Sequence, residues 1–138
     1  MSHPLFRMLR ENAAATDPDA KDARLRGRTY AVPFDQVWRA SLALADRDLT
    51  GWRVVEADDY DGVIRAEANA RFPRSVADVT IRITLDANAQ TRVDASARSR
   101  TPRGDWGASV RHLVQFFTAL DRMLESGGPP PPSLRRTA

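Results

Sequence analysis

The sequence predicts an α+β domain: an antiparallel sheet of four to five strands with two helices packed on one face. Three observations support this fold class. Apolar and polar residues alternate over 76–85 and 91–100, as in strands with one buried face. The turn-forming segments at 58–62 and 86–90 are short enough to connect the two strands of a hairpin. Apolar residues also recur at helical spacing in two longer stretches. The expected order is strand, helix, four strands, helix.

The first half of the domain begins with a strand expected at 28–32. Pro33 follows at a position that favours a helix start, because proline at the first turn loses no hydrogen bond there. The apolar stripe of this first helix consists of Phe34, Val37, Trp38, Ser41, Leu42, Ala45 and Leu49. Two further strands are expected at 52–57 and 63–69, and they form a hairpin around the turn between them.

The second half contains the two alternating strands and a long helix expected at 105–126. The helix has an apolar stripe formed by Trp106, Val110, Leu113, Val114, Phe117, Leu120 and Leu124. Because Phe116 is adjacent to Phe117, the two rings are not expected to face the core equally. We expect Phe116 either to be an exposed apolar anchor or to pack under an edge of the sheet.

A chain of 138 residues fits one domain. We assign 1–26 to an N-terminal arm, 27–126 to the single α+β domain and 127–138 to a proline-rich C-terminal tail. No run of 18 apolar residues is present, so no membrane span is expected. The N-terminus lacks the apolar region of a secretory signal, which favours a cytoplasmic location.

Composition argues against several classes of activity. The chain has no cysteine, which excludes thiol catalysis and thiolate metal sites. The two histidines, His3 and His112, are too few to build a metal set, and no catalytic triad or phosphate loop is suggested. We therefore expect no enzyme activity, no catalytic residue, no metal and no cofactor. The formal net charge is only +3 and the polar strand face mixes both signs, so no specific nucleic-acid binding is expected.

The candidate binding residues are Arg98, Arg100, Arg103 and Asp105, which lie at the corner between the last strand and the last helix. One interpretation is an anion or partner site at the helix N-terminus. The other is structural: Asp105 caps the helix, and the arginines pair with acidic residues of the domain. We expect Asp105 to cap the helix, and Arg98 and Arg100 to project from the polar face of the sheet. If both arginines are buried in ion pairs within the domain, the corner is structural.

This corner and the two strands before it also carry a family resemblance. The chain resembles the bacterial family called domain of unknown function 1499, which combines an alternating strand, an arginine-rich strand and a glycine-containing helix start. The matching residues are Asp78, Val93, Asp94, Ser96, Arg98, Ser99, Arg100, Gly104, Asp105, Gly107 and Arg111. Trp106 and Ser109 depart from the leucine and asparagine usual there. The resemblance spans residues 28–124 and implies a fold, with no general activity to carry over.

These observations lead to two main hypotheses on function, and weak nucleic-acid binding is a third. The first is a non-catalytic protein-interaction module, for example an accessory subunit of a larger bacterial assembly, that contacts a protein partner through its tails or its polar sheet face. The alternative is a small apolar-ligand binding or carrier domain, because helices over a curved sheet can enclose an apolar cavity.

Overall fold

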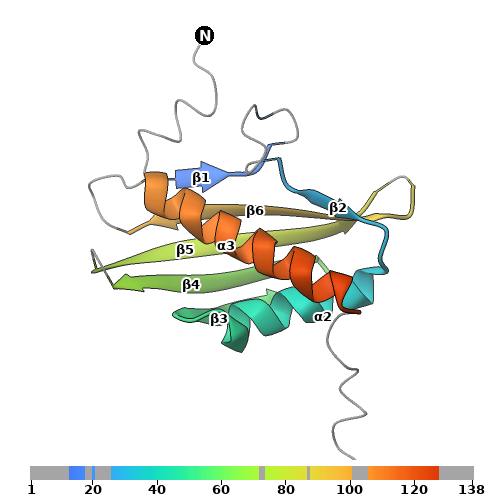
Figure 1. Ribbon diagram of the computed structural model, residues 1–138, viewed down its shortest axis with the longest axis horizontal. Coiled ribbons are helices and arrows are strands. Elements are labelled where there is room, and N and C mark those ends of the chain that lie inside the picture. Colours follow the sequence, from blue (N-terminus) through green and yellow to red (C-terminus); the bar gives the residue numbers. More distant parts are fainter. Residues whose placement is uncertain are drawn as a thin grey trace, which may run out of the picture.

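The computed structural model describes residues 13–17, 20, 26–71, 74–86, 88–100 and 106–127. Within them, strands and helices follow one another as shown in Figure 1. The elements are β1 (Ala13–Ala15), β2 (Arg28–Tyr30), α2 (Phe34–Ala43), the π-helical turn η2 (Leu44–Asp48), β3 (Trp52–Asp58), β4 (Val63–Arg71), β5 (Arg74–Leu85), β6 (Thr91–Ser99) and α3 (Trp106–Glu125).

The strands form one six-stranded antiparallel sheet in the order β1-β6-β5-β4-β3, and β2 also pairs with β6. Strands β3 to β6 are the predicted meander. β5 pairs with β6 along one side. Along the other side, β1 pairs with residues 96–98 of β6 and β2 pairs with residues 91–93. Both helices pack on the same face of this sheet (Figure 1). The predicted α+β fold class is thereby confirmed.

Strand β1 comes from the segment that the sequence assigned to an N-terminal arm. Its three alanines have no polar–apolar alternation, so no side-chain pattern marks it as a strand. Backbone pairing places Ala14 opposite Ala97, and Ala14 is fully buried. Thr16 extends the contact: its N–H donates to the Ala95 carbonyl over 2.8 Å, and its hydroxyl donates to Asp94 over 2.9 Å. The arm therefore supplies a strand of the sheet.

The first helix begins after Pro33, as the sequence indicated, and buries Val37, Ala40 and Ser41. It continues into η2, where the Leu49 N–H donates to the Leu44 carbonyl, five residues earlier, over 3.0 Å. The wider turn keeps Leu44 and Ala45 buried. The predicted apolar stripe therefore runs through both elements.

The core lies between the helices and the apolar face of the sheet. Its largest fully buried side chains are Phe116, Phe117, Ile64, Ile81, Ile83, Leu113, Leu120, Val37, Val79 and Val93. Phe116 and Phe117 are both 0% exposed, so the expectation that they would differ in burial is wrong. The Phe116 ring stacks on Trp52 of β3 at a centroid distance of 6.0 Å and meets Phe117 edge-on at 5.3 Å. Of the two expectations for Phe116, packing under a sheet edge is confirmed.

A carboxylate near the C-terminal end of α3 connects this helix to β2. The Tyr30 hydroxyl donates to Asp121 over 2.5 Å, and Arg28 pairs with the same carboxylate over 3.3 Å. The Arg28 guanidinium also lies 5.1 Å from the centre of the Phe117 ring, which is a cation–π distance. Burial, together with the hydrogen bond to Asp121, raises the pKa of Tyr30 well above its usual value. The short strand β2 is therefore held against the helix layer as well as the sheet.

Candidate functional site

The face of the sheet opposite the helices carries the charged residues that the sequence placed there. Its arginines include Arg98, which is exposed on β6 and lies opposite Asp78 of β5. Asp78 is in turn opposite Glu67 of β4, and Glu67 is opposite Arg53 of β3. One row of charges thus crosses four strands with arginines outside and carboxylates inside. We call this surface the open face.

Arg100 lies just beyond β6 and connects the two central carboxylates. Its Nη2 and Nε donate to the two oxygens of Asp78 over 2.6 and 3.0 Å. The same Nη2 donates to Glu67 over 2.5 Å, and Arg53 donates to the other Glu67 oxygen over 2.7 Å. Glu67 and Asp78 are direct cross-strand neighbours, an arrangement that is unfavourable for like charges. The arginines offset this repulsion.

The same contacts set the protonation of the network. Hydrogen bonds from Arg100 and then Arg53 hold the pKa of Glu67 below its usual value. The hydrogen bond from Arg100 also lowers the pKa of Asp78, and the two carboxylates together raise the pKa of Arg100. All of these groups are therefore charged at neutral pH, and the donors of Arg100 are directed at carboxylates of its own domain.

The predicted corner is only partly described by the structure. Arg98 and Arg100 are both exposed on the open face, as expected, and 49% of the Arg100 side chain remains accessible despite its ion pairs. Arg103 and Asp105 lie outside the described residues, and so does the predicted cap of α3. Arg100 fits the structural interpretation of the corner, because its guanidinium joins β4 to β5. Arg98 remains a candidate contact residue.

Replacing Arg100 with glutamine is expected to weaken the pH dependence of stability on the acid side. Because the folded-state pKa values of Glu67 and Asp78 are lowered, their contribution is complete above their usual values of 4.5 and 3.8 and disappears as the pH falls through the folded values. The variant is therefore less stable than the parent near neutral pH, and the difference shrinks in acid. Urea unfolding midpoints measured at about pH 7 and about pH 3 test this.

Arg82→Gln is the matched control, because it removes a cation from the same face without touching these two carboxylates. Its difference from the parent should change less between the two pH values than that of Arg100→Gln, because Arg82 has no hydrogen bond to Glu67 or Asp78. A difference for Arg100→Gln that does not change with pH would show that the network has no linked titration.

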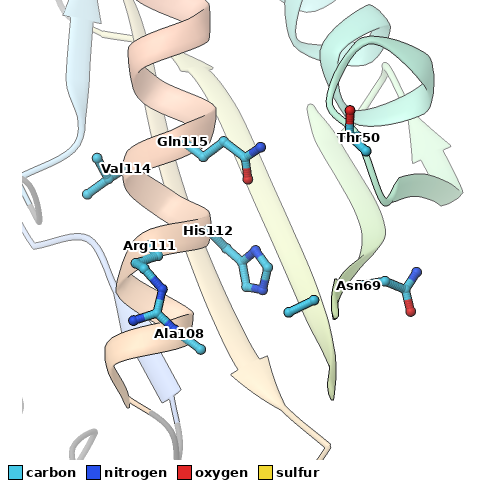
Figure 2. A pocket seen from close by; sticks show the side chains of 8 residues that line it. Thr50, Asn69, Ala108, Arg111, His112, Val114 and Gln115 are labelled. Carbon is cyan, nitrogen blue, oxygen red and sulfur yellow. The ribbon is translucent and has the colours of Figure 1, made fainter. Parts of the chain in front are cut away.

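A second feature is a groove between α3 and the end of β4 (Figure 2). Its volume is about 520 Å³, and the described residues that line it are Thr50, Asn69, Ala70, Ala108, Arg111, His112, Val114 and Gln115. Figure 2 shows His112 and Gln115 projecting from α3 toward β4, while the Arg111 side chain lies along the helix near Ala108. The groove therefore has a polar wall on α3.

Two contacts with Trp52 position this wall. The Trp52 indole N–H donates to Oε1 of Gln115 over 3.3 Å, and the His112 ring meets the indole edge-on at a centroid distance of 6.0 Å. His112 is buried, whereas Arg111 and Gln115 are exposed. On the opposite side, the Asn69 amide donates to the Gly51 carbonyl over 3.0 Å, which connects the end of β4 to the segment before β3.

This groove was not predicted from the sequence. The spacing of Ala108, Arg111, His112 and Gln115 places them on one side of a helix, and that spacing was the available signal. Thr50 and Asn69 come from segments far away in the chain, and no local pattern connects them to α3.

Within the described ranges, no group of three or more histidines and carboxylates is arranged to hold a metal ion. None of the helices that the structure describes is both long enough and apolar enough to span a membrane.

These features define an α+β domain whose sheet has one helix-covered face and one open, charged face. The chain belongs to the family described as protein of unknown function (DUF1499), whose model matches residues 8–120. This confirms the resemblance seen in the strand and helix sequences. No curated protein matches the chain. The family description names no activity.

Proposed function

We propose that this domain is a non-catalytic protein-interaction module whose open face binds an acidic surface of a partner protein within a larger bacterial assembly. One observation carries the proposal: in the part of the chain that the structure describes, the helices cover only one side of the sheet, and the other side presents more arginines than carboxylates. Among the side chains that the structure describes, the arginines of that side are Arg53, Arg65, Arg74, Arg82, Arg92, Arg98 and Arg100. The described carboxylates of that side are fewer: Glu56, Asp58, Glu67, Asp78 and Asp94.

The internal ion pairs support docking by preorganising this surface. Arg53 and Arg100 are held by Glu67, and Arg92 is held by Asp94 over 2.8 Å. An arginine already fixed in one geometry loses less side-chain freedom when a partner binds. Complementary charges at such a surface favour the correct partner and speed association more than they add affinity.

The electrostatics of the two central carboxylates support a non-catalytic role. A general acid or base works best with a pKa near the operating pH. The arginine contacts of Glu67 and Asp78 move their pKa values in the opposite direction, further below neutrality. These groups are suited to fixing a surface, and poorly suited to proton transfer.

A protein partner is favoured over nucleic acid. Surfaces that bind single strands combine positive charge with aromatic platforms for base stacking. Among the described residues, the large exposed hydrophobic side chains are Val55, Tyr60 and Leu85, and the aromatic one, Tyr60, lies in the turn between β3 and β4 rather than on the sheet. The mixed signs of the open face also suit a protein surface better than a phosphate backbone.

The alternative hypothesis, a small apolar-ligand binding or carrier domain, is less well supported. Carriers need open apolar space between helix and sheet. In the described part of the chain that space holds the rings of Phe116 and Phe117 and the side chains of Ile64, Ile81 and Leu113, which are at most 1% exposed.

The proposal is tested by site-specific photo-crosslinking in cells of the source organism. A photoreactive side chain is introduced at Thr80 or Ser96, which face each other at the centre of the open face. We expect both positions to crosslink the same protein. The yield should fall about tenfold when Arg82→Glu and Arg98→Glu are added, because reversing interface charges repels an acidic partner.

The matched controls use the exposed side of α3. A photoreactive side chain at Thr118 should not yield that product, and Arg122→Glu should leave the yield from the open face unchanged. Thermal unfolding confirms that each variant is folded. The proposal is refuted if the crosslinking yield does not change when the charges are reversed. It is also refuted if the crosslinked product is nucleic acid instead of protein.

A further inference from the structure

We propose that the groove between α3 and β4 is a binding site for a small organic anion, whose carboxylate or phosphate group is held by Arg111 and Gln115. The site lies on the helix-covered side of the sheet and is independent of the open face (Figure 2). The proposal therefore goes beyond the interaction function and does not depend on it.

The charge of the lining favours an anion. Among the described residues of the groove, Arg111 is a permanent cation and none is a carboxylate. Elsewhere on this domain, arginines such as Arg53 and Arg100 pair with acidic neighbours. The described residues that line the groove present Arg111 with no such neighbour, so its guanidinium can pair with an incoming oxyanion.

The orientation of Gln115 adds a hydrogen-bond donor. The indole N–H of Trp52 can only donate, so the atom of Gln115 that it contacts is the amide oxygen. The amide nitrogen, which is the donor end of Gln115, is left at the groove. The Thr50 hydroxyl lies across the groove in Figure 2 and provides another donor. Donors on both sides suit a group that only accepts hydrogen bonds.

The first turn of α3 and three apolar residues supply the remaining features of the binding site. Ala108 lies in the first turn of α3, where the helix dipole favours negative charge and adds to the effect of Arg111. Ala70, Ala108 and Val114 provide apolar contact for the body of a ligand. The volume of about 520 Å³ is within the range of roughly 300–1,000 Å³ usual for small-molecule sites. The expected ligand is therefore a short acyl carboxylate or a phosphate monoester.

The test is an NMR titration of the full chain with three probes: hexanoate, hexyl phosphate and the uncharged hexanamide. We expect saturable shifts of the Gln115 side-chain amide and of the backbone amides of Ala70 and Ala108 with at least one anion. Hexanamide should bind at least about tenfold more weakly, because it lacks the charge-assisted hydrogen bonds. Binding of only one anion identifies the headgroup as carboxylate or phosphate.

Two variants and one control locate the site. Arg111→Gln removes the cation, and Gln115→Glu keeps an acceptor for Trp52 while placing a negative charge in the groove. Each should weaken anion binding by about tenfold or more. Arg122→Gln removes an exposed arginine of the same helix outside the groove and should leave binding unchanged.

The proposal is overturned if neither anion gives saturable shifts, or if hexanamide binds as tightly as the anions. It is also overturned if Arg111→Gln and Gln115→Glu bind like the parent, or if Arg122→Gln weakens binding as much as they do. None of these results bears on the open face, whose partner is tested by crosslinking.

Discussion

Replacing Gly62 with alanine is expected to lower the free energy of unfolding by about 3 kcal/mol or more, for two reasons that add. Gly62 has a φ of +71°, which an L-residue with a Cβ adopts only with strain. A Cβ at this position would also lie 2.1 Å from the Ile83 carbonyl oxygen, a backbone atom that cannot rotate away. The Gly62 carbonyl accepts the Ile83 N–H over 2.7 Å, so relieving the clash would break a sheet contact.

Gly127→Ala provides a matched control for Gly62→Ala. Gly127 also has a positive φ, +94°, but a Cβ there would meet no atom within 4 Å. Its substitution should cost only the backbone term, about 1–2 kcal/mol. Chemical denaturation of the two variants separates the strain from the clash. Equal losses for both would mean that the approach of Ile83 to the turn does not constrain this position.

Replacing Phe116 with alanine is expected to cost about 3–5 kcal/mol of stability. The ring is fully buried and contacts both Trp52 and Phe117, so its removal leaves a cavity where α3 packs on the edge strand. Domains of this kind have total stabilities of about 5–15 kcal/mol, and the variant should therefore lose a large part of its margin. Urea unfolding followed by tryptophan fluorescence measures the loss, because Trp52 is one of the neighbours of the ring.

Phe116→Leu is the control, since it keeps most of the apolar volume and should cost clearly less than the alanine variant. If Phe116→Ala loses less than about 1 kcal/mol, the ring does not occupy the core position described above.

The periodic elements could be predicted from the sequence. Strict alternation in β5 and β6 identified both strands and their buried faces, and helical spacing identified α2 and α3. β1 could not be found in this way, because three alanines have no pattern and the strand exists through backbone pairing with β6. Phe116 was ambiguous, because a simple stripe does not reveal that β3 packs against the side of α3.

The candidate site was predicted less completely than the fold. Charge and alternation correctly placed Arg98 and Arg100 on the open face. They did not identify the Glu67 partner of Arg100, which lies 33 residues away in the chain. The groove residues Thr50 and Gln115 are likewise brought near each other only by the packing of α3 beside the end of β4.

The sequence by itself therefore determined the apolar faces of β5, β6, α2 and α3, where the turns lie and which family the chain resembles, because side-chain periodicity and turn preferences are local properties. Only the tertiary structure decided that β1 completes the sheet, that Arg100 joins Glu67 to Asp78, and that a groove forms beside Arg111. Those features depend on strand register and helix packing between distant segments. Gly62 depends on both levels. The local sequence predicts its place in a turn, and the tertiary structure brings it into contact with Ile83.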